Sequence, residues 1–306
     1  MSKQSFELLI LGATAASPSV DRNSSAQLLN IAERYCLIDC GEATQIQLRK
    51  FKAKFQAIDH VFISHLHGDH FFGLPGLLSS MHLLGRKQAL YVYGPENLKK
   101  MMDLLFEVSE TQLNYPIHWV YTNAKEKNLL FEDEKVEIYS FPLKHRIQCT
   151  GFLFSEKKLP RKIDKFLMEK HKLSQADIHL LKNGEDVLNI DGQLIMNAEA
   201  TIDPPKARTY AYCSDTIFDL NVVQYIKDAD VLYHESTFLN DMHERAGKTF
   251  HSTAQQAATI AKSAQVKHLV LGHFSARYRK IEDFLTEART IFEACELATD
   301  GKKIKI

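Results

Sequence analysis

Short hydrophobic runs rich in β-branched residues alternate along the chain with longer stretches that have helical periodicity. The short runs have the length and composition of buried strands, whereas the longer stretches repeat apolar residues every three to four positions. Strands are expected at 6–11, 26–30, 35–39, 60–64, 89–93, 136–141, 150–154, 210–213, 230–234 and 268–271, and helices at 42–52, 95–108, 220–227, 253–264 and 281–297. Clustered strands followed by strands interleaved with helices predict an α/β fold in which two sheets pack together with helices outside.

Two of the expected helices have recognisable first residues. Pro95 suits a first helical turn, where the missing N–H costs no hydrogen bond. Ser252 is expected to cap the helix that follows it, because a serine hydroxyl can accept from a free backbone N–H.

The overall composition indicates a globular protein but does not point to a binding partner. The 306 residues are 45% hydrophobic and 25% charged, which is typical of a globular protein that buries a full core. Lys+Arg and Asp+Glu both number 38, so no global positive charge points to nucleic acid. Any RNA contact must therefore come from local patches or from a metal site that anchors phosphate.

The N-terminus and the cysteines indicate a cytoplasmic protein. The apolar run at 6–11 is too short for a signal peptide or a membrane span. The five cysteines contain no CxxC pair and are expected to be reduced and mostly buried. They are Cys36, Cys40, Cys149, Cys213 and Cys295.

One charged stretch, residues 156–186, interrupts the alternation of strands and helices. It carries eight Lys or Arg against six Asp or Glu and contains a helix-like piece at 163–171. Two interpretations remain open: a solvated surface insertion, or a protruding arm that grips a polyanion. We expect a single domain over residues 1–306 with this arm-like insertion.

The strongest chemical signal is His65-Leu66-His67-Gly68-Asp69-His70, at the end of an expected strand. Three imidazoles and a carboxylate this close would each need a partner if buried. Neutral imidazole and carboxylate are ligands that suit zinc. His65 and His67 can point the same way from an extended segment, and Asp69 and His70 follow on the next turn. This spacing indicates two metals in one cleft.

Three further candidate ligands follow expected strands. They are His145, Asp215 and His273. Each alone is weak evidence, but together they complete the ligand count that two metals require.

Several segments resemble the tRNase Z (ribonuclease Z) branch of the metallo-β-lactamase superfamily. The His65–His70 motif is shared with many hydrolases of this superfamily, and the other segments narrow the resemblance. These are Phe71-Phe72-Gly73-Leu74-Pro75-Gly76, His234-Glu235-Ser236-Thr237-Phe238, His251-Ser252-Thr253, Leu271-Gly272-His273-Phe274-Ser275-Ala276-Arg277-Tyr278, Ser17-Pro18 with Arg22-Asn23, and Asp39-Cys40-Gly41-Glu42. The resemblance spans residues 6 to about 280 and implies the αββα sandwich of that superfamily.

The resemblance also implies a set of functional residues and two Zn²⁺ per subunit. One zinc would be held by His65, His67 and His145, the other by Asp69, His70 and His273, with Asp215 bridging both. A zinc-activated hydroxide would attack the phosphodiester. Asp69 would also accept a proton. His251, oriented by Glu235, would be the general acid for the leaving 3′-oxygen. Alternatively, Glu235 would orient a zinc-bound histidine. His234 is interpreted as structural.

Substrate contacts and assembly follow from the same resemblance. Arg277 and the pair Arg22-Asn23 are candidate contacts for the tRNA end, or ordinary surface residues. Short forms of the family carry an arm with a glycine-proline tip, whereas this chain has Leu173-Ser174-Gln175-Ala176-Asp177 there. Its lysines, Lys162 and Lys165 among them, would still contact phosphates. The length resembles the homodimeric short form.

The expected function is therefore endonucleolytic removal of the 3′ trailer from precursor tRNA, which leaves a 3′-hydroxyl. The alternative is another metallo-β-lactamase-fold phosphodiesterase, or an arylsulfatase-like hydrolase, that acts on small substrates. A catalytically dead RNA-binding relative would be expected to have lost ligands, and every expected ligand is present.

Overall fold

The computed structural model describes residues 5–306, which divide into two compact units. The first unit contains residues 5–155 and 208–306, and the second contains residues 156–207. We describe each unit by itself.

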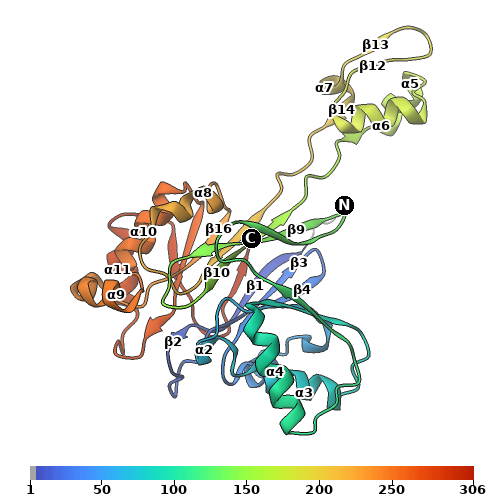
Figure 1. Ribbon diagram of the computed structural model, residues 1–306. Coiled ribbons are helices and arrows are strands. Elements are labelled where there is room, and N and C mark those ends of the chain that lie inside the picture. Colours follow the sequence, from blue (N-terminus) through green and yellow to red (C-terminus); the bar gives the residue numbers. More distant parts are fainter. Residues whose placement is uncertain (1–4) are drawn as a thin grey trace. The chain divides into compact units, whose positions relative to one another are not determined.

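The first unit contains two seven-stranded mixed sheets (Figure 1). The strand order of one sheet is β20 (Lys303–Lys305), β1 (Phe6–Gly12), β3 (Ala26–Ile31), β4 (Arg34–Cys40), β5 (Ile58–Phe62), β6 (Leu90–Gly94) and β7 (Ile117–Tyr121). The order of the other is β19 (Cys295–Leu297), β17 (His268–Gly272), β16 (Val231–Glu235), β15 (Thr209–Cys213), β10 (Cys149–Glu156), β9 (Val136–Leu143) and β8 (Asn128–Glu132). Each sheet has a parallel half and an antiparallel half.

The two sheets pack face to face through aromatic and aliphatic side chains. Phe62 of β5 lies edge-on to Phe152 and Phe154 of β10, with ring centroids 5.3 and 5.2 Å apart. All three rings are fully buried, and edge-to-face packing of this kind adds to the hydrophobic gain. This shared core joins the sheets into a sandwich.

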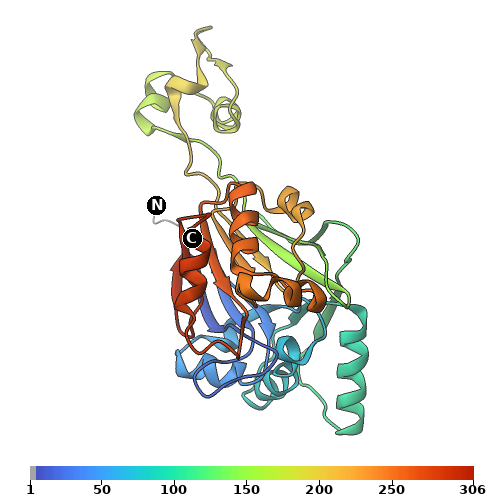
Figure 2. The ribbon, with the colours of Figure 1, turned by 90° about the vertical axis from the view of Figure 1, so that its left-hand side faces the viewer.

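Helices cover both outer faces of the sandwich (Figures 1 and 2). On one face lie α1 (Thr44–Lys50), α3 (Leu74–Leu83) and α4 (Glu96–Val108), and on the other lie α8 (Val223–Ile226), α10 (Ala254–Ser263) and α11 (Glu282–Arg289). The predicted αββα architecture is confirmed. Among the described residues no helix is long and apolar enough to cross a bilayer.

Some predictions of local structure were wrong. The helix expected over 281–297 ends at Arg289, because Cys295–Leu297 pairs with β17 as strand β19. Thr253, not Ser252, caps α10: its hydroxyl accepts from the N–H of Gln256, and the Ser252 hydroxyl donates instead to the Thr216 carbonyl. In both places, contacts with residues distant in the sequence decided the local structure, and the local sequence pattern did not.

The parallel half of the second sheet positions the residues that matter for function. Strands β15, β16 and β17 are buried on both faces, as parallel strands under helices usually are. Their register aligns Cys213 with His234 and Leu271. Their carboxyl ends therefore meet at one edge of the sheet, where functional groups gather in α/β folds.

The second unit has its own small core of Leu181, Val187, Ile195 and Ala200. Its elements are β11 (Lys162–Ile163), α5 (Lys165–Lys170), α6 (Gln175–Asn183), β12 (Val187–Leu188), β13 (Leu194–Ile195), α7 (Asn197–Ala200) and β14 (Thr201–Ile202). The expected insertion stopped at Asp186, but the unit continues to Ala207 because three of the four core residues lie beyond that point.

The segment that stands in place of a glycine-proline tip begins α6. The Ser174 hydroxyl accepts from the Asp177 N–H, and the Asp177 carboxylate accepts from the Ser174 N–H, which forms a capping box. Leu173 packs against the small core. These residues therefore have a structural role inside the second unit.

Candidate metal centre and active site

The seven predicted metal ligands all lie in the segments that follow the carboxyl ends of strands. His65 and His67 lie between β5 and α2 (Gly68–Phe71), and Asp69 and His70 lie within α2. His145 follows β9, Asp215 follows β15, and His273 follows β17. His273 has a φ of 59°, a left-handed conformation that turns its side chain out of the strand direction.

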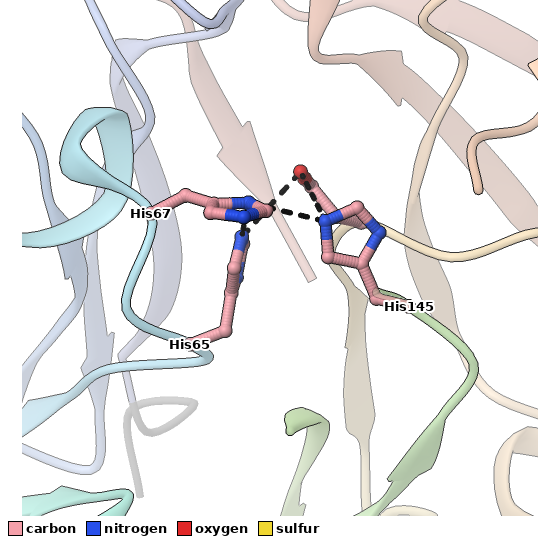
Figure 3. Close-up of side chains that lie close together, drawn as sticks. His65, His67 and His145 are labelled. Carbon is pink, nitrogen blue, oxygen red and sulfur yellow. Dashed lines mark hydrogen bonds and ion pairs between the residues drawn. The ribbon is translucent and has the colours of Figure 1, made fainter. Parts of the chain in front are cut away.

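The first group of ligand atoms consists of three histidines and one carboxylate (Figure 3). The Nδ1 atom of His67 lies 3.1 Å from Nε2 of both His65 and His145. Oδ2 of Asp215 lies 3.5 Å from Nε2 of His65 and 3.7 Å from that of His145. Figure 3 shows the three imidazoles converging on one point, which is the geometry of a metal-ion cage.

The second group lies on the other side of Asp215. Nε2 atoms of His70 and His273 are 3.3 Å apart, and Oδ2 of Asp69 lies 3.4 Å from each. Oδ1 of Asp215 lies 3.3 Å from Nε2 of His70 and 3.1 Å from that of His273. The two oxygens of Asp215 therefore face the two groups, one each.

The proton positions on three imidazoles follow from their outer hydrogen bonds. Nδ1 of His145 lies 2.9 Å from the Phe250 carbonyl, and Nδ1 of His70 lies 2.7 Å from the carboxylate of Asp39. Because these partners only accept, Nδ1 carries a proton, and Nε2 is the ring nitrogen that faces the cluster and is free to bind a cation. Nδ1 of His273 bonds the Thr237 hydroxyl at 2.9 Å in the same arrangement.

These atoms fit two divalent cations. Ring nitrogens of neighbouring imidazoles lie 3.1 and 3.3 Å apart in the two groups, so a cation between them would be bound by several nitrogens at once. Oδ1 of Asp215 is buried without a hydrogen bond, although Nε2 of His70 and of His273 lie 3.3 and 3.1 Å from it. Nitrogen and carboxylate oxygen are the donors that zinc accepts in catalytic sites. The chain therefore presents two groups of N/O ligand atoms, and the carboxylate of Asp215 has one oxygen facing each group.

The electrostatics of the centre favour bound positive charge. Burial lowers the pKa of His67 and His145 to about 4, so both are neutral ligands at neutral pH. Burial opposes the charge on Asp215, but the surrounding imidazoles hold its pKa well below its usual range. Burial likewise disfavours a charged His70, yet the carboxylates of Asp69, Asp215 and Asp39 raise its pKa well above 6.5. Negative charge thus dominates around His70.

His251 and Glu235 form a hydrogen-bonded pair beside the metal ligands. Nδ1 of His251 lies 2.8 Å from Oε1 of the fully buried Glu235. Burial lowers the pKa of His251, but the Glu235 carboxylate, with Asp215, outweighs it and raises the pKa to about 9. The His251 ring lies 5.2 and 5.5 Å from those of His145 and His273. A cationic imidazole therefore sits next to both ligand groups.

Two residues of the site had no role in the sequence analysis. Thr237 donates to Oε2 of Glu235 at 2.6 Å and accepts from His273, so Glu235 reaches both His251 and a ligand histidine. Asp39 accepts from Tyr212 and the Ser64 N–H as well as from His70. Both residues lie in quoted family segments, which was the only sequence signal for them.

The ligands open into a cavity of about 410 Å³. Its lining comprises Ala15, Ala16, Ser17, His67, Asp69, Arg146, Asp215, Thr237, Phe238, Arg245, Thr249, His251, His273, Ser275, Ala276 and Arg277. The predicted contact Arg277 is among them, together with two arginines that the sequence analysis missed.

The other predicted contacts lie elsewhere. Arg22 donates to the Tyr278 carbonyl at 2.8 Å, and the Asn23 side chain donates to Asp300 at 2.7 Å. Both residues brace the N-terminal loop and neither lines the cavity. Lys162 and Lys165 are exposed residues of the second unit.

Comparisons with known proteins agree with this geometry. The family model described as "Anti-Pycsar protein Apyc1" matches residues 6–159. A ribonuclease Z from Cytophaga hutchinsonii is 46% identical over 98% of this chain and 96% of its own length. A ribonuclease Z from Bacteroides thetaiotaomicron is 42% identical over 99% of this chain and 96% of its own. The crystal structure of human tRNase Z, short form, matches with a TM-score of 0.71 at 29% identity, over 98% of this chain and 99% of the human one.

The fold and the histidine–carboxylate cluster define a protein of the metallo-β-lactamase fold, to which the Bacillus subtilis protein YhfI also belongs (TM-score 0.70, 16% identity, 98% of this chain and 99% of that one). The Apyc1 match stops before Asp215, Glu235, His251 and His273. The curated relatives cover these residues as well. This chain belongs to the ribonuclease Z family.

Proposed function

We propose that this protein is a metal-dependent endoribonuclease that removes the 3′ trailer from precursor tRNA and leaves a 3′-hydroxyl. Full-length relatives named ribonuclease Z and the similarity to human tRNase Z support this function. The observation that carries it is the His251–Glu235 pair, 2.8 Å apart, placed against a cage of N/O ligands. Both features favour hydrolysis of a phosphodiester with a poor leaving group, because one can protonate the leaving oxygen and the other can hold an activating cation.

Incubating zinc-loaded protein with a precursor tRNA that carries a 3′ trailer tests the proposal. Mapping the product end should show one cut and a tRNA 3′-hydroxyl, and bis(p-nitrophenyl) phosphate should be hydrolysed in parallel. Hydrolysis of the small ester without tRNA cleavage would instead support the alternative of a small-substrate phosphodiesterase. No cleavage despite intact zinc binding would contradict the tRNA assignment.

We propose two Zn²⁺ per subunit as the cofactor. His65, His67 and His145 would hold one ion, Asp69, His70 and His273 the other, and Asp215 both. When bound, the ions would supply Lewis acidity that lowers the pKa of a water and offsets charge on the phosphodiester. Asp69, an ionised group in the cavity lining, is the proposed proton acceptor.

The remaining chemistry belongs to the chain itself. His251 is held in one orientation by Glu235 and would donate its proton to the leaving 3′-oxygen. Glu235 is fixed in turn by the Thr216 N–H at 3.0 Å and by Thr237. Because these contacts already exist, the proton donor is positioned before substrate binds.

Removing the metal is expected to inactivate and destabilise the protein. Chelation should abolish cleavage of both substrates and lower the Tm, because the metal-free cluster keeps a buried Asp215 oxygen without a partner. A ligand that binds only the folded protein and is present at 100 times its Kd raises the free energy of unfolding by about 2.7 kcal/mol. Calorimetry with and without chelator, followed by zinc re-addition, measures the effect. An unchanged Tm would contradict a preformed zinc site.

The arm-like second unit is proposed to contact tRNA through Lys162 and Lys165. Residues 156–207 contain nine Lys or Arg and nine Asp or Glu, so the unit is neutral overall. Its N-terminal part is basic, with seven Lys or Arg against two Asp or Glu over 157–172. This local excess is the feature that supports a phosphate contact.

Replacing both Lys162 and Lys165 with glutamine is expected to lower kcat/KM for precursor tRNA several-fold. Each lost phosphate contact should also reduce the slope of log(kcat/KM) against log[salt] by about 0.9. Turnover of bis(p-nitrophenyl) phosphate should not change. A matched Lys182→Gln variant, in α6 of the same unit, is the control. Equal salt slopes for all variants would exclude these two contacts.

We further propose a homodimer in the cytoplasm. The five cysteines are all free and buried, which suits a reducing compartment. Helix α4 buries Leu98 and Met102 but also exposes a second apolar stripe on its outer face. That stripe consists of Met101, Leu104, Leu105 and Val108. Exposed apolar stripes on helices commonly mark protein interfaces.

A Leu104→Glu/Val108→Glu variant is expected to be monomeric, because these two side chains are 61% and 77% exposed in the single chain. Light scattering of wild-type and variant protein at matched concentration measures the mass. Glu107→Lys changes the charge of an exposed residue on a different face of the same helix and should leave the mass unchanged. A wild-type monomer, or a variant that stays dimeric, would contradict this interface.

A further inference from the structure

Three arginine side chains line the cavity above the metal ligands, namely Arg146, Arg245 and Arg277. Within residues 5–306 none of the three forms an ion pair, whereas Arg34 and Arg86 pair with Asp133 and Asp59. Unpaired guanidinium groups around one concave site indicate an anionic ligand with more than one negative group.

The cavity offers these arginines no carboxylate of its own. Asp69 and Asp215 are its only acidic lining residues, and both belong to the metal-ligand groups. The nearby Glu235 is engaged by His251. All three arginines are exposed, so their guanidinium groups are available to an anionic substrate.

Arg146 and Arg245 both come from the His145–His251 side of the cavity. Arg146 directly follows His145, whose Nδ1 donates to the Phe250 carbonyl. Arg245 lies on α9 (His243–Thr249), which runs directly into Phe250 and His251. Arg277, in contrast, follows His273 and the short strand β18 (Phe274–Ser275).

The end of α9 holds this side of the cavity in place. Phe250 has a left-handed backbone, with φ 59° and ψ 47°, a conformation that residues other than glycine seldom adopt. The His251 N–H donates to the Ala246 carbonyl at 2.9 Å. A strained turn kept at this position ties α9, with Arg245, to the proposed proton donor.

The chemistry of the proposed function places the substrate relative to these residues. His251 protonates the 3′-oxygen of the last nucleotide that stays on the tRNA. That nucleotide must therefore extend from the scissile phosphate on the His251 side. Its own phosphate, one step toward the 5′ end, then lies on the side from which Arg146 and Arg245 come.

We infer that Arg146 and Arg245 form a second phosphate-binding subsite, which holds the phosphodiester directly 5′ to the scissile bond. This inference rests on the proposed function. The subsite positions the retained nucleotide so that its 3′-oxygen meets His251. A small ester without a flanking phosphate gains nothing from it.

The test uses zinc-loaded full-length protein, two substrates and two modified tRNAs. Arg146→Gln, Arg245→Gln and the double variant are compared with Lys262→Gln, which removes an exposed charge from α10 outside the cavity. Each variant is assayed on precursor tRNA, and on precursors with one neutral methylphosphonate directly 5′ or directly 3′ to the scissile phosphate. Bis(p-nitrophenyl) phosphate reports on the metal centre alone.

We expect the double variant to lose about 10- to 100-fold in kcat/KM on unmodified precursor, as losing about 1.4–2.7 kcal/mol of charge-assisted bonds implies. On the precursor with the 5′ methylphosphonate, kcat/KM of the wild-type protein should fall to that of the double variant on unmodified precursor. The double variant should lose little further activity on this modified precursor. The 3′ methylphosphonate should reduce wild type and double variant by the same factor. Hydrolysis of the small ester, and all activities of Lys262→Gln, should stay within twofold.

Three results would overturn the inference. The 5′ methylphosphonate and the arginine substitutions could each lower kcat/KM by a factor that is independent of the other. Such independent losses would show that the arginines do not contact that phosphate. Coupling at the 3′ position would place the arginines on the trailer side. A parallel loss of small-ester hydrolysis would give them a structural role in the metal centre. Wild-type protein that hydrolyses the small ester but not precursor tRNA would be a distinct result, which overturns the proposed function itself.

Discussion

An Asp215→Ala variant is expected to lose zinc and at least about 10²–10³-fold in turnover on precursor tRNA, the cost of removing one central electrostatic group. Asp215 is the one side chain whose two oxygens face the two ligand groups, at 3.1–3.7 Å from four histidine nitrogens. Without it, each of the two proposed ions would lose a ligand, and the negative charge between the two groups would be removed. Metal analysis after gel filtration and single-turnover cleavage measure the two effects.

The metal-free proteins separate a ligand role from a folding role. Metal-free wild type buries a carboxylate oxygen without a hydrogen bond, so the alanine variant should unfold at the same temperature or higher in the presence of chelator. With zinc present, the wild-type protein should instead unfold at a higher temperature than the alanine variant. Asp283→Ala, a change of an exposed carboxylate on α11, should match wild type throughout. A variant that keeps two zinc ions and normal turnover would contradict the bridging role.

A His251→Ala variant is expected to keep both zinc ions and lose about 10²–10⁴-fold on precursor tRNA, the usual contribution of a general acid. A ribose 3′-oxygen leaves poorly without a proton, whereas p-nitrophenolate leaves without one. The loss on bis(p-nitrophenyl) phosphate should therefore be small. Comparing the two substrates at equal zinc content isolates proton donation from metal binding.

Controls for this prediction lie in the same structure. Glu235→Gln should reproduce much of the loss, because the neutral amide no longer stabilises the imidazolium at 2.8 Å. His268→Gln, a partly exposed histidine paired with Glu296, should have no effect. Zinc loss in His251→Ala would instead make His251 a ligand, since it also lies within reach of Asp215 and His273.

Features that depend on neighbouring residues along the chain were predictable from the sequence. Short apolar runs rich in β-branched residues located ten strands, because a buried strand needs its own side chains to be apolar wherever its partners lie. Four potential ligand side chains within six residues indicated metal at 65–70, since such a cluster is costly in any fold without a cation. His145, Asp215 and His273 were expected after the ends of strands, which suggested that they join this cluster. In the structure their ligand atoms do lie beside those of residues 65–70.

Features that depend on the register between distant strands could not be predicted in this way. Cys295–Leu297 is a strand only because β17 presents a free edge beside it, and the second unit extends to Ala207 only because its last residues fill its core. Asp39 lies 31 residues before His70 and meets it through the packing of β4 against β5. Arg146 and Arg245 look like ordinary surface arginines in the sequence. Their shared place beside His251 arises from the contact of two loops, which no local pattern encodes.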